Sequence, residues 1–175
     1  MTEGTVFDNE IIELGDWFPF FDSRVDLQTG EVTFFPSKEG AATFQIRPLT
    51  LFYEEIRNKK KKEYKWVSNP KTHAMERRGH DPDQTPEDEQ REREDSYDYA
   101  ITGARNAYWG KGKDNPIFCI APKIASTNEE KEELRRSRAD KIKLMRDPAF
   151  SRYFLRVQEM LSNFGAKAKE ELEKN

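Results

Sequence analysis

The alternation of apolar and polar residues near the N-terminus predicts an antiparallel sheet. Residues 24–27 and 31–34 alternate with a period of two around a short loop that contains a glycine, which is typical of a β-hairpin. Residues 42–47 alternate again and predict a third strand. The aromatic cluster at 17–21 contains Pro19, so we expect it to pack across the sheet without forming a regular interior strand.

After residue 48 the apolar positions follow a helical period. The pattern predicts a helix over 49–56 and then a strand over 63–68, where alternation returns. Residues 69–85 contain proline and glycine and have no periodicity, which predicts a polar loop. A threonine, a proline and early acidic residues follow, and they predict a helix from 86 to about 109.

The pattern of the C-terminal half is mostly helical. The continuous apolar run at 116–121 predicts a short buried strand. Thr127 and Glu130 have the spacing of a capping box and predict a helix that ends near Arg146. Residues 148–164 form the clearest amphipathic helix of the chain, closed by Gly165, although the last ten residues could extend it as a solvated tail.

Together these elements predict an α+β fold, with a small, mostly antiparallel sheet (a hairpin plus one or two further strands) followed by a helical C-terminal half. The length of 175 residues fits one domain. We expect a β-rich part at 1–68, a polar loop at 69–85 and a helical part at 86–175 that contains the inserted strand at 116–121. The pattern leaves open whether that strand joins the first sheet.

Composition predicts a thin core and a cytoplasmic location. Hydrophobic residues make up 35% of the chain and charged residues 36%, with a mean hydropathy of −0.99. Aromatic residues reach 12%, which argues against general disorder. No run of apolar residues is long enough for a membrane span, and no signal-peptide pattern opens the chain. The single cysteine, Cys119, fits a reducing compartment.

Charge is strongly segregated along the chain. Residues 1–22 carry six acids and no base. Residues 57–78 carry nine bases against two acids, a net charge of +7. Residues 81–98 carry nine acids against two bases, a net charge of −7. The distribution of charge is therefore more informative than the total of −3.

The basic segment at 57–78 is the first candidate binding site, because cations that seek phosphate alternate there with aromatic rings on which bases could stack. The predicted contacts to nucleic acid or another polyanion are Lys59, Lys60, Lys61, Lys62, Lys65, Trp66, Arg77 and Arg78. Two alternatives stay open: the segment is a solvated helix end and loop, or it docks on the acidic segment at 81–98.

An enzymatic alternative is a magnesium-dependent nuclease. Glu63 and Lys65 form the Glu-x-Lys pattern of restriction-like nucleases, and Asp26 would be the upstream acid. That pattern is common in charged proteins, so we lean towards a protein that is not an enzyme. Two histidines, His73 and His80, with one cysteine do not make the usual structural zinc set, and we expect no metal and no cofactor.

Two further features suggest contacts. The loop Gly110-Lys111-Gly112-Lys113 is too short for a phosphate-binding loop of known type, although it could touch a phosphate as part of a basic loop. The amphipathic helix at 148–164 has an aromatic face that could bury against a protein partner or a second copy. The residues of that expected interface are Phe150, Tyr153, Phe154, Val157 and Leu161.

The leading hypothesis is a non-enzymatic cytosolic binding or accessory protein, in the style of a phage or bacterial chain. It would engage a protein or a nucleic acid–protein assembly through its segregated charge and its aromatic helix face. The nuclease is one alternative, and a virion or assembly component is another.

Overall fold

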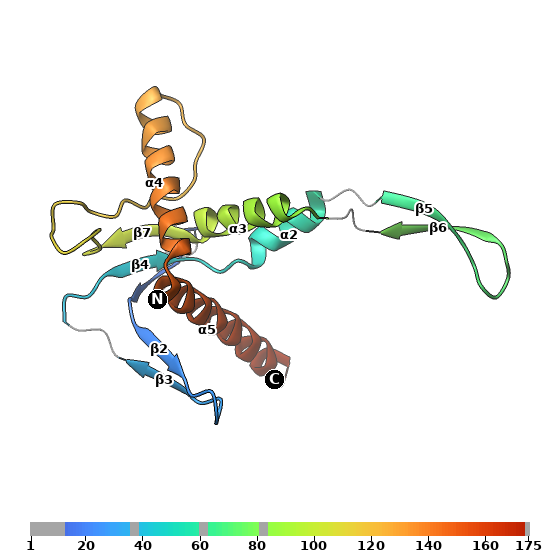
Figure 1. Cartoon of the computed structure of the whole chain (residues 1–175), viewed down its shortest axis with the longest axis horizontal. Helices are drawn as coiled ribbons and strands as arrows, with labels where there is room; N and C mark the ends of the chain where they lie inside the picture. Colours follow the sequence, from blue (N-terminus) through green and yellow to red (C-terminus); the bar gives the residue numbers. More distant parts are fainter. Residues whose placement is uncertain (1–12, 36–38, 60–62, 81–83, 174–175) are drawn as a thin grey trace, which may run out of the picture. The chain divides into compact units, whose positions relative to one another are not determined.

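The computed structural model describes residues 13–35, 39–59, 63–80 and 84–173. Only the backbone is described at Val25, Val32, Phe34, Glu63, His80 and residues 164–173. The chain divides into two compact units, which we describe separately: unit 1 comprises the residues up to Leu49 and those from Glu94 onward, and unit 2 comprises Thr50–Arg93. Antiparallel strands and helices together give the predicted α+β fold (Figure 1).

Unit 1 is built on a three-stranded antiparallel sheet. Its strands are β1 (Asp16–Pro19), β4 (Thr43–Ile46) and β7 (Ile101–Arg105), in the order β1-β4-β7. β4 confirms the strand expected at 42–47. β1 is an edge strand that ends at Pro19, in agreement with the exclusion of a regular interior strand there. Part of the aromatic cluster therefore belongs to the sheet itself, where it was expected to pack across it.

The helix predicted over 86–109 is too long. Helix α3 (Pro86–Ala100) stops at Ala100, and the chain continues directly as β7. Residues Ile101 to Gly103 favour the strand. Ile101 and Thr102 are β-branched, Ile101 and Gly103 pair with β4, and Gly103 lies where space is short. A Cβ at Gly103 would lie 2.8 Å from the Trp17 ring. Contacts with distant strands therefore end this helix.

The β-hairpin of unit 1 is confirmed, with shifted bounds. β2 (Asp22–Val25) pairs antiparallel with β3 (Val32–Phe35). Asp26 begins the turn, and its carboxylate accepts the N–H groups of Gln28 (2.8 Å) and Thr29 (3.3 Å). Such a side-chain-to-backbone turn fixes the register of the hairpin.

Two helices complete unit 1. α4 (Asn128–Arg146) has the predicted capping box, in which the Thr127 hydroxyl accepts the Glu130 N–H. α5 (Pro148–Glu173) continues past Gly165, which agrees with the alternative of a C-terminal extension and not with an end at that glycine. The alanine, lysine and glutamate residues that follow Gly165 are strong helix formers, and one glycine costs a helix only about 1 kcal/mol.

The run at 116–121 is not a regular strand. Only two isolated bridges occur there, Gly103 with Ile120 and Tyr108 with Pro116. Side chains of α4 accept hydrogen bonds from backbone N–H groups that would otherwise donate to a neighbouring strand. The Phe118 N–H donates to Asp140 (2.9 Å) and the Ile120 N–H donates to the Ser137 hydroxyl (2.9 Å). The run is therefore held by polar side chains, although Cys119 is buried as expected.

The core of unit 1 lies between the sheet and the aromatic face of α5. The Tyr97 and Phe154 rings stack at 4.1 Å, and the Phe44 and Phe150 rings meet edge to face at 4.8 Å. Four residues of the expected partner interface are buried in this core: Phe150, Tyr153, Phe154 and Val157. Their role is corrected to core packing, and Leu161 packs against the same core while partly exposed.

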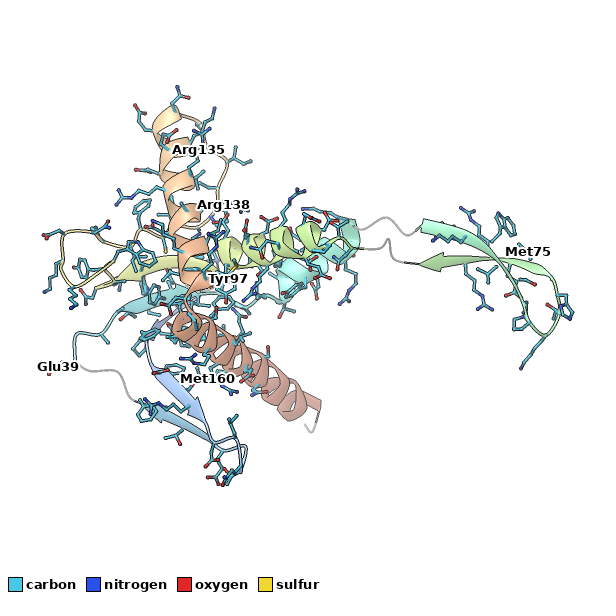
Figure 2. All side chains as sticks on the ribbon, in the orientation of Figure 1. Glu39, Met75, Tyr97, Arg135, Arg138 and Met160 are labelled. Atoms are coloured by element: carbon cyan, nitrogen blue, oxygen red, sulfur yellow. The ribbon has the colours of Figure 1, made fainter. Side chains whose placement is uncertain are left out.

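A polar network joins α3 to α4 inside unit 1 (Figure 2). Arg138 pairs with Asp95 (2.7 Å) and Asp98 (3.3 Å), and the buried Lys141 pairs with Asp98 (2.9 Å). Two acidic residues in the C-terminal part of the segment 81–98 are therefore paired with cations of α4. Among the helices of the described chain, none has a stretch long and apolar enough to cross a membrane.

Unit 2 contains α2 (Thr50–Lys59), β5 (Glu63–Ser68), β6 (Met75–His80) and the first turns of α3. The predicted helix and the predicted strand at 63–68 are both present. The expectation of a loop over 69–85 is wrong at β6, because residues 75–80 form a regular ladder with β5. Charged residues obscure this strand in the sequence, since they leave no apolar alternation to recognise.

Candidate polyanion-binding hairpin

The β5–β6 hairpin has an ordered turn that sets its register. The Asn69 N–H donates to the Ala74 carbonyl and the His73 N–H to the Asn69 carbonyl, both at 2.8 Å. The Asn69 side chain also accepts the Lys71 N–H at 2.9 Å. His73 closes the turn with a positive φ of 57°. Part of the polar segment predicted as a loop thus forms this turn.

Antiparallel pairing decides which side chains share a face, because directly opposed residues point to the same side. Trp66 lies opposite Arg77, Tyr64 opposite Gly79 and Ser68 opposite Met75. One face of the hairpin, the ring face, therefore carries Tyr64, Trp66, Met75 and Arg77. Figure 2 shows side chains projecting to both sides of this two-stranded ribbon, with Met75 labelled near its turn.

The ring face is exposed. The exposed fraction is 66% for Trp66, 55% for Tyr64 and 58% for Met75. The Arg77 guanidinium lies 4.2 Å from the centroid of the Tyr64 ring, a cation–π contact. Glycine at the position opposite Tyr64 adds no side chain beside that ring. The face therefore offers two exposed rings, with one cation held against the ring of Tyr64.

The opposite face of the hairpin, the charged face, carries Lys65, Val67, Glu76 and Arg78. Lys65 lies directly opposite Arg78. Arg78 also pairs with Glu76 at 3.4 Å, and the Asn69 amide donates to Glu76 at 2.5 Å. These hydrogen bonds, first that of Asn69 and then that of Arg78, lower the pKa of Glu76. The charged form of Glu76 is thus stabilised by its neighbours, and the Lys65 side chain is exposed.

Isolated two-stranded sheets are marginally stable in water, and large exposed apolar side chains mark contact surfaces. Here the exposed side chains lie on two short strands that pair only with each other in the part of the chain described. Covering them with a ligand would both order the hairpin and remove apolar area from water. The hairpin therefore has the features of a binding arm.

The structure brings half of the predicted polyanion contacts together. Lys65, Trp66, Arg77 and Arg78 all lie on the hairpin. Lys59 ends α2, where it is exposed and pairs with Glu55 at 3.7 Å. The remaining three, Lys60, Lys61 and Lys62, lie outside the described residues.

Met75 is a residue of the ring face that the sequence did not indicate. Its placement depends on the pairing of β6 with β5. The signal that could have revealed it is the turn-forming run Asn-Pro-Lys-Thr-His at 69–73, between two segments of six residues each.

The nuclease residues are not assembled by any described geometry. The Asp26 carboxylate already accepts two turn N–H groups in unit 1, whereas Glu63 and Lys65 belong to unit 2. The Glu63 side chain is not described. Within the described ranges, no group of three or more His, Cys, Asp or Glu side chains is arranged to hold a metal ion. The nuclease remains a hypothesis from sequence.

Comparison of this chain with protein-family models, with curated proteins and with solved structures gives no match. The functional argument therefore starts from the hairpin.

Proposed function

We propose that this protein is a non-enzymatic binding protein whose β5–β6 hairpin contacts nucleic acid. The observation that carries the proposal is the exposure of Tyr64 and Trp66 on one face of a hairpin that also presents Lys65, Arg77 and Arg78. Rings and cations in alternation suit a chain of bases and phosphates.

The cations would contact phosphates. Arg77 and Arg78 are adjacent on β6 and so project to opposite faces, which places positive charge on both sides of the ribbon. Lys71 adds a cation in the turn, and Lys59 is exposed at the end of α2. Contacts of this kind bind by releasing counterions, so the affinity they give falls steeply with salt.

The rings would contact bases. Stacking of a base on an exposed aromatic side chain contributes about 1–3 kcal/mol and tolerates any sequence. Trp66 is the more exposed of the two rings, and the Arg77 guanidinium already covers one side of Tyr64. Trp66 is therefore the main stacking residue, with Tyr64 and Arg77 beside it.

The proposed contact surface is the hairpin, and not the aromatic helix face that the sequence suggested. The α5 aromatic face is buried in the core of unit 1. A protein partner would therefore also have to bind another part of the chain. A cytosolic accessory role, in which the bound nucleic acid belongs to a larger assembly, remains part of the proposal.

Fluorescence anisotropy with labelled single- and double-stranded DNA, at about 50 and 200 mM salt, tests this function. We expect saturable binding at the lower salt that weakens by at least about tenfold at the higher salt, because several phosphate contacts are lost. Absence of binding to both probes at the lower salt would contradict the proposal.

A matched pair of triple variants assigns the binding to the hairpin. The test variant combines Lys65→Ala, Arg77→Ala and Arg78→Ala. The control removes three exposed cations of unit 1: Lys123→Ala, Lys131→Ala and Arg135→Ala. We expect the test variant to bind at least about tenfold more weakly than the control at low salt. Equal losses would show that net charge, and not the hairpin, binds the DNA.

A further inference from the structure

Unit 1 contains an open pocket of about 550 Å³, which the proposed function does not use. Its apolar walls come from the sheet, from α4 and from the start of α5, and they include Phe20, Phe44, Ile117, Leu144 and Phe150. Small-molecule sites commonly have volumes of about 300–1,000 Å³ and mostly apolar walls with a few polar groups. The pocket is therefore large enough for a nucleotide-sized ligand.

The rim of the pocket is the loop Gly110–Lys113, which the sequence marked as basic. The Trp109 N–H donates to the Asn115 carbonyl at 2.8 Å and closes this loop. Gly110 has a φ of 80°, and no atom lies within 4 Å of the position that its Cβ would take. The backbone of the rim is thus open to a close-fitting ligand.

The rim carries two cations that an anion could contact. Lys111 and Lys113 are exposed and form no ion pair with any residue of the described ranges. The acid that lines the pocket, Asp147, uses its carboxylate to accept the Phe150 N–H at 2.9 Å, at the start of α5. Two exposed cations therefore lie near two carboxylates: Asp147, which is already hydrogen-bonded, and Asp114, whose carboxylate lies 3.4 Å from the position that a Cβ would take at Gly112.

Two aromatic residues that directly precede the rim loop in the chain also line the pocket. Trp109 and Tyr108 line the pocket next to the rim. The Trp109 indole N–H donates to Asp140 at 3.2 Å, which holds the ring in place. A flat apolar group inside the pocket would lie against these rings while a negatively charged group reaches the rim.

We propose that this pocket binds an organic phosphate of nucleotide size. The flat body enters between the aromatic walls, and the phosphates meet Lys111, Lys113 and the backbone of the glycine-containing loop. This site is separate from the hairpin and does not depend on nucleic-acid binding.

Isothermal titration calorimetry with ATP, adenosine and inorganic tripolyphosphate tests the proposal on the full chain. We expect ATP to bind more tightly than either of its parts, because only ATP occupies both pocket and rim. The double variant Lys111→Ala, Lys113→Ala should bind ATP at least about tenfold more weakly than the control Lys123→Ala, Lys131→Ala. A Lys65→Ala, Arg78→Ala variant should bind ATP as the native chain does.

Three results would overturn this inference. One is the absence of saturable ATP binding at millimolar ligand. Another is tripolyphosphate binding as tightly as ATP, which would leave the apolar pocket without a role. The third is an equal loss of ATP affinity in the Lys111/Lys113 variant and in its control.

Discussion

Lys141 is the most unusual residue of unit 1, because it is a fully buried cation. Its ammonium donates to the Asp98 carboxylate (2.9 Å), the Asp98 carbonyl (2.8 Å) and the Ile120 carbonyl (2.6 Å). An ammonium has three protons to donate, so it is fully satisfied here. The residue thereby ties the end of α3 to the irregular run before α4.

Replacing this lysine should strongly destabilise the protein. We expect Lys141→Ala to lower the free energy of unfolding by about 3–5 kcal/mol, because it leaves a cavity and removes the ammonium from a buried ion pair with Asp98 and from its hydrogen bond to the Ile120 carbonyl. Lys141→Met fills the space and should cost less. Urea unfolding of the three chains measures both effects, and an alanine variant as stable as the native chain would contradict this account.

The same residue should affect how stability depends on pH. Burial lowers the pKa of Lys141 below its ordinary value of 10.5, and Asp98 opposes that shift. The unfolded chain then holds this proton to higher pH than the folded chain does, so the stability of the native chain relative to Lys141→Met rises as pH increases towards 10.5. A difference that falls with pH in urea titrations would contradict the direction of this shift.

Cys119 should be chemically inert in the folded protein. It is 7% exposed, and burial raises the pKa of its thiol to about 12. The thiolate is therefore scarce at pH 8, and we expect a disulfide reagent to label the native chain at least about a hundredfold more slowly than the chain in denaturant. Equal labelling rates would show that the thiol is accessible in the folded state.

At the scale of elements, α4 depends on its capping box. The Thr127 hydroxyl accepts the Glu130 N–H at 3.2 Å, and the Glu130 carboxylate accepts the Thr127 N–H at 3.3 Å. We expect Thr127→Ala to lower the free energy of unfolding by about 1 kcal/mol, because the N–H of Glu130 then lacks this acceptor. Thr127→Ser keeps the hydroxyl and is the control; thermal unfolding of both variants with the same midpoint would contradict this role.

Local patterns predicted the elements whose causes are local. The hairpin before residue 35, strand β4, helix α2 and the start of α4 follow from alternation, apolar stripes or caps. The end of α3 did not follow, because Ile101 and Gly103 pair with β4, a strand more than 50 residues earlier. The run at 116–121 was also misread, since its partners are the polar side chains of Ser137 and Asp140.

At the scale of the whole molecule, the chain divides into two compact units. The hydrophobic core described above belongs to unit 1, whereas α2 has no fully buried residue. Stability and proposed binding should therefore be separable.

Replacing residues 61–82 by a short Gly–Ser linker tests this separation. We expect the melting temperature of the main unfolding transition to change by less than about 4 °C, which corresponds to about 1 kcal/mol for a domain of this size. DNA binding should be lost at the same time. Loss of cooperative unfolding in near-UV circular dichroism would show that unit 1 needs the hairpin in order to fold.

The candidate site was only partly predictable. Density of charge located the basic segment, and the rings near it were visible in the sequence. Which residues share a face was not visible in the sequence. Trp66 lies opposite Arg77 only because of the register of two strands that the turn at Asn69 joins. The aromatic face of α5 was assigned to a partner because the sequence could not show that the sheet covers it.

The central claim is that cations of the hairpin hold phosphates while Trp66 holds a base. The most direct measurement is the salt dependence of single-stranded DNA affinity for the native chain, a Lys65→Ala, Arg78→Ala variant and Trp66→Ala. The account predicts that the slope of log affinity against log salt concentration is shallower by about 1.4 for the double variant, because each lost phosphate contact contributes about 0.7 to that slope. Trp66→Ala should bind more weakly with an unchanged slope. Coincident lines for all three chains would contradict the claim.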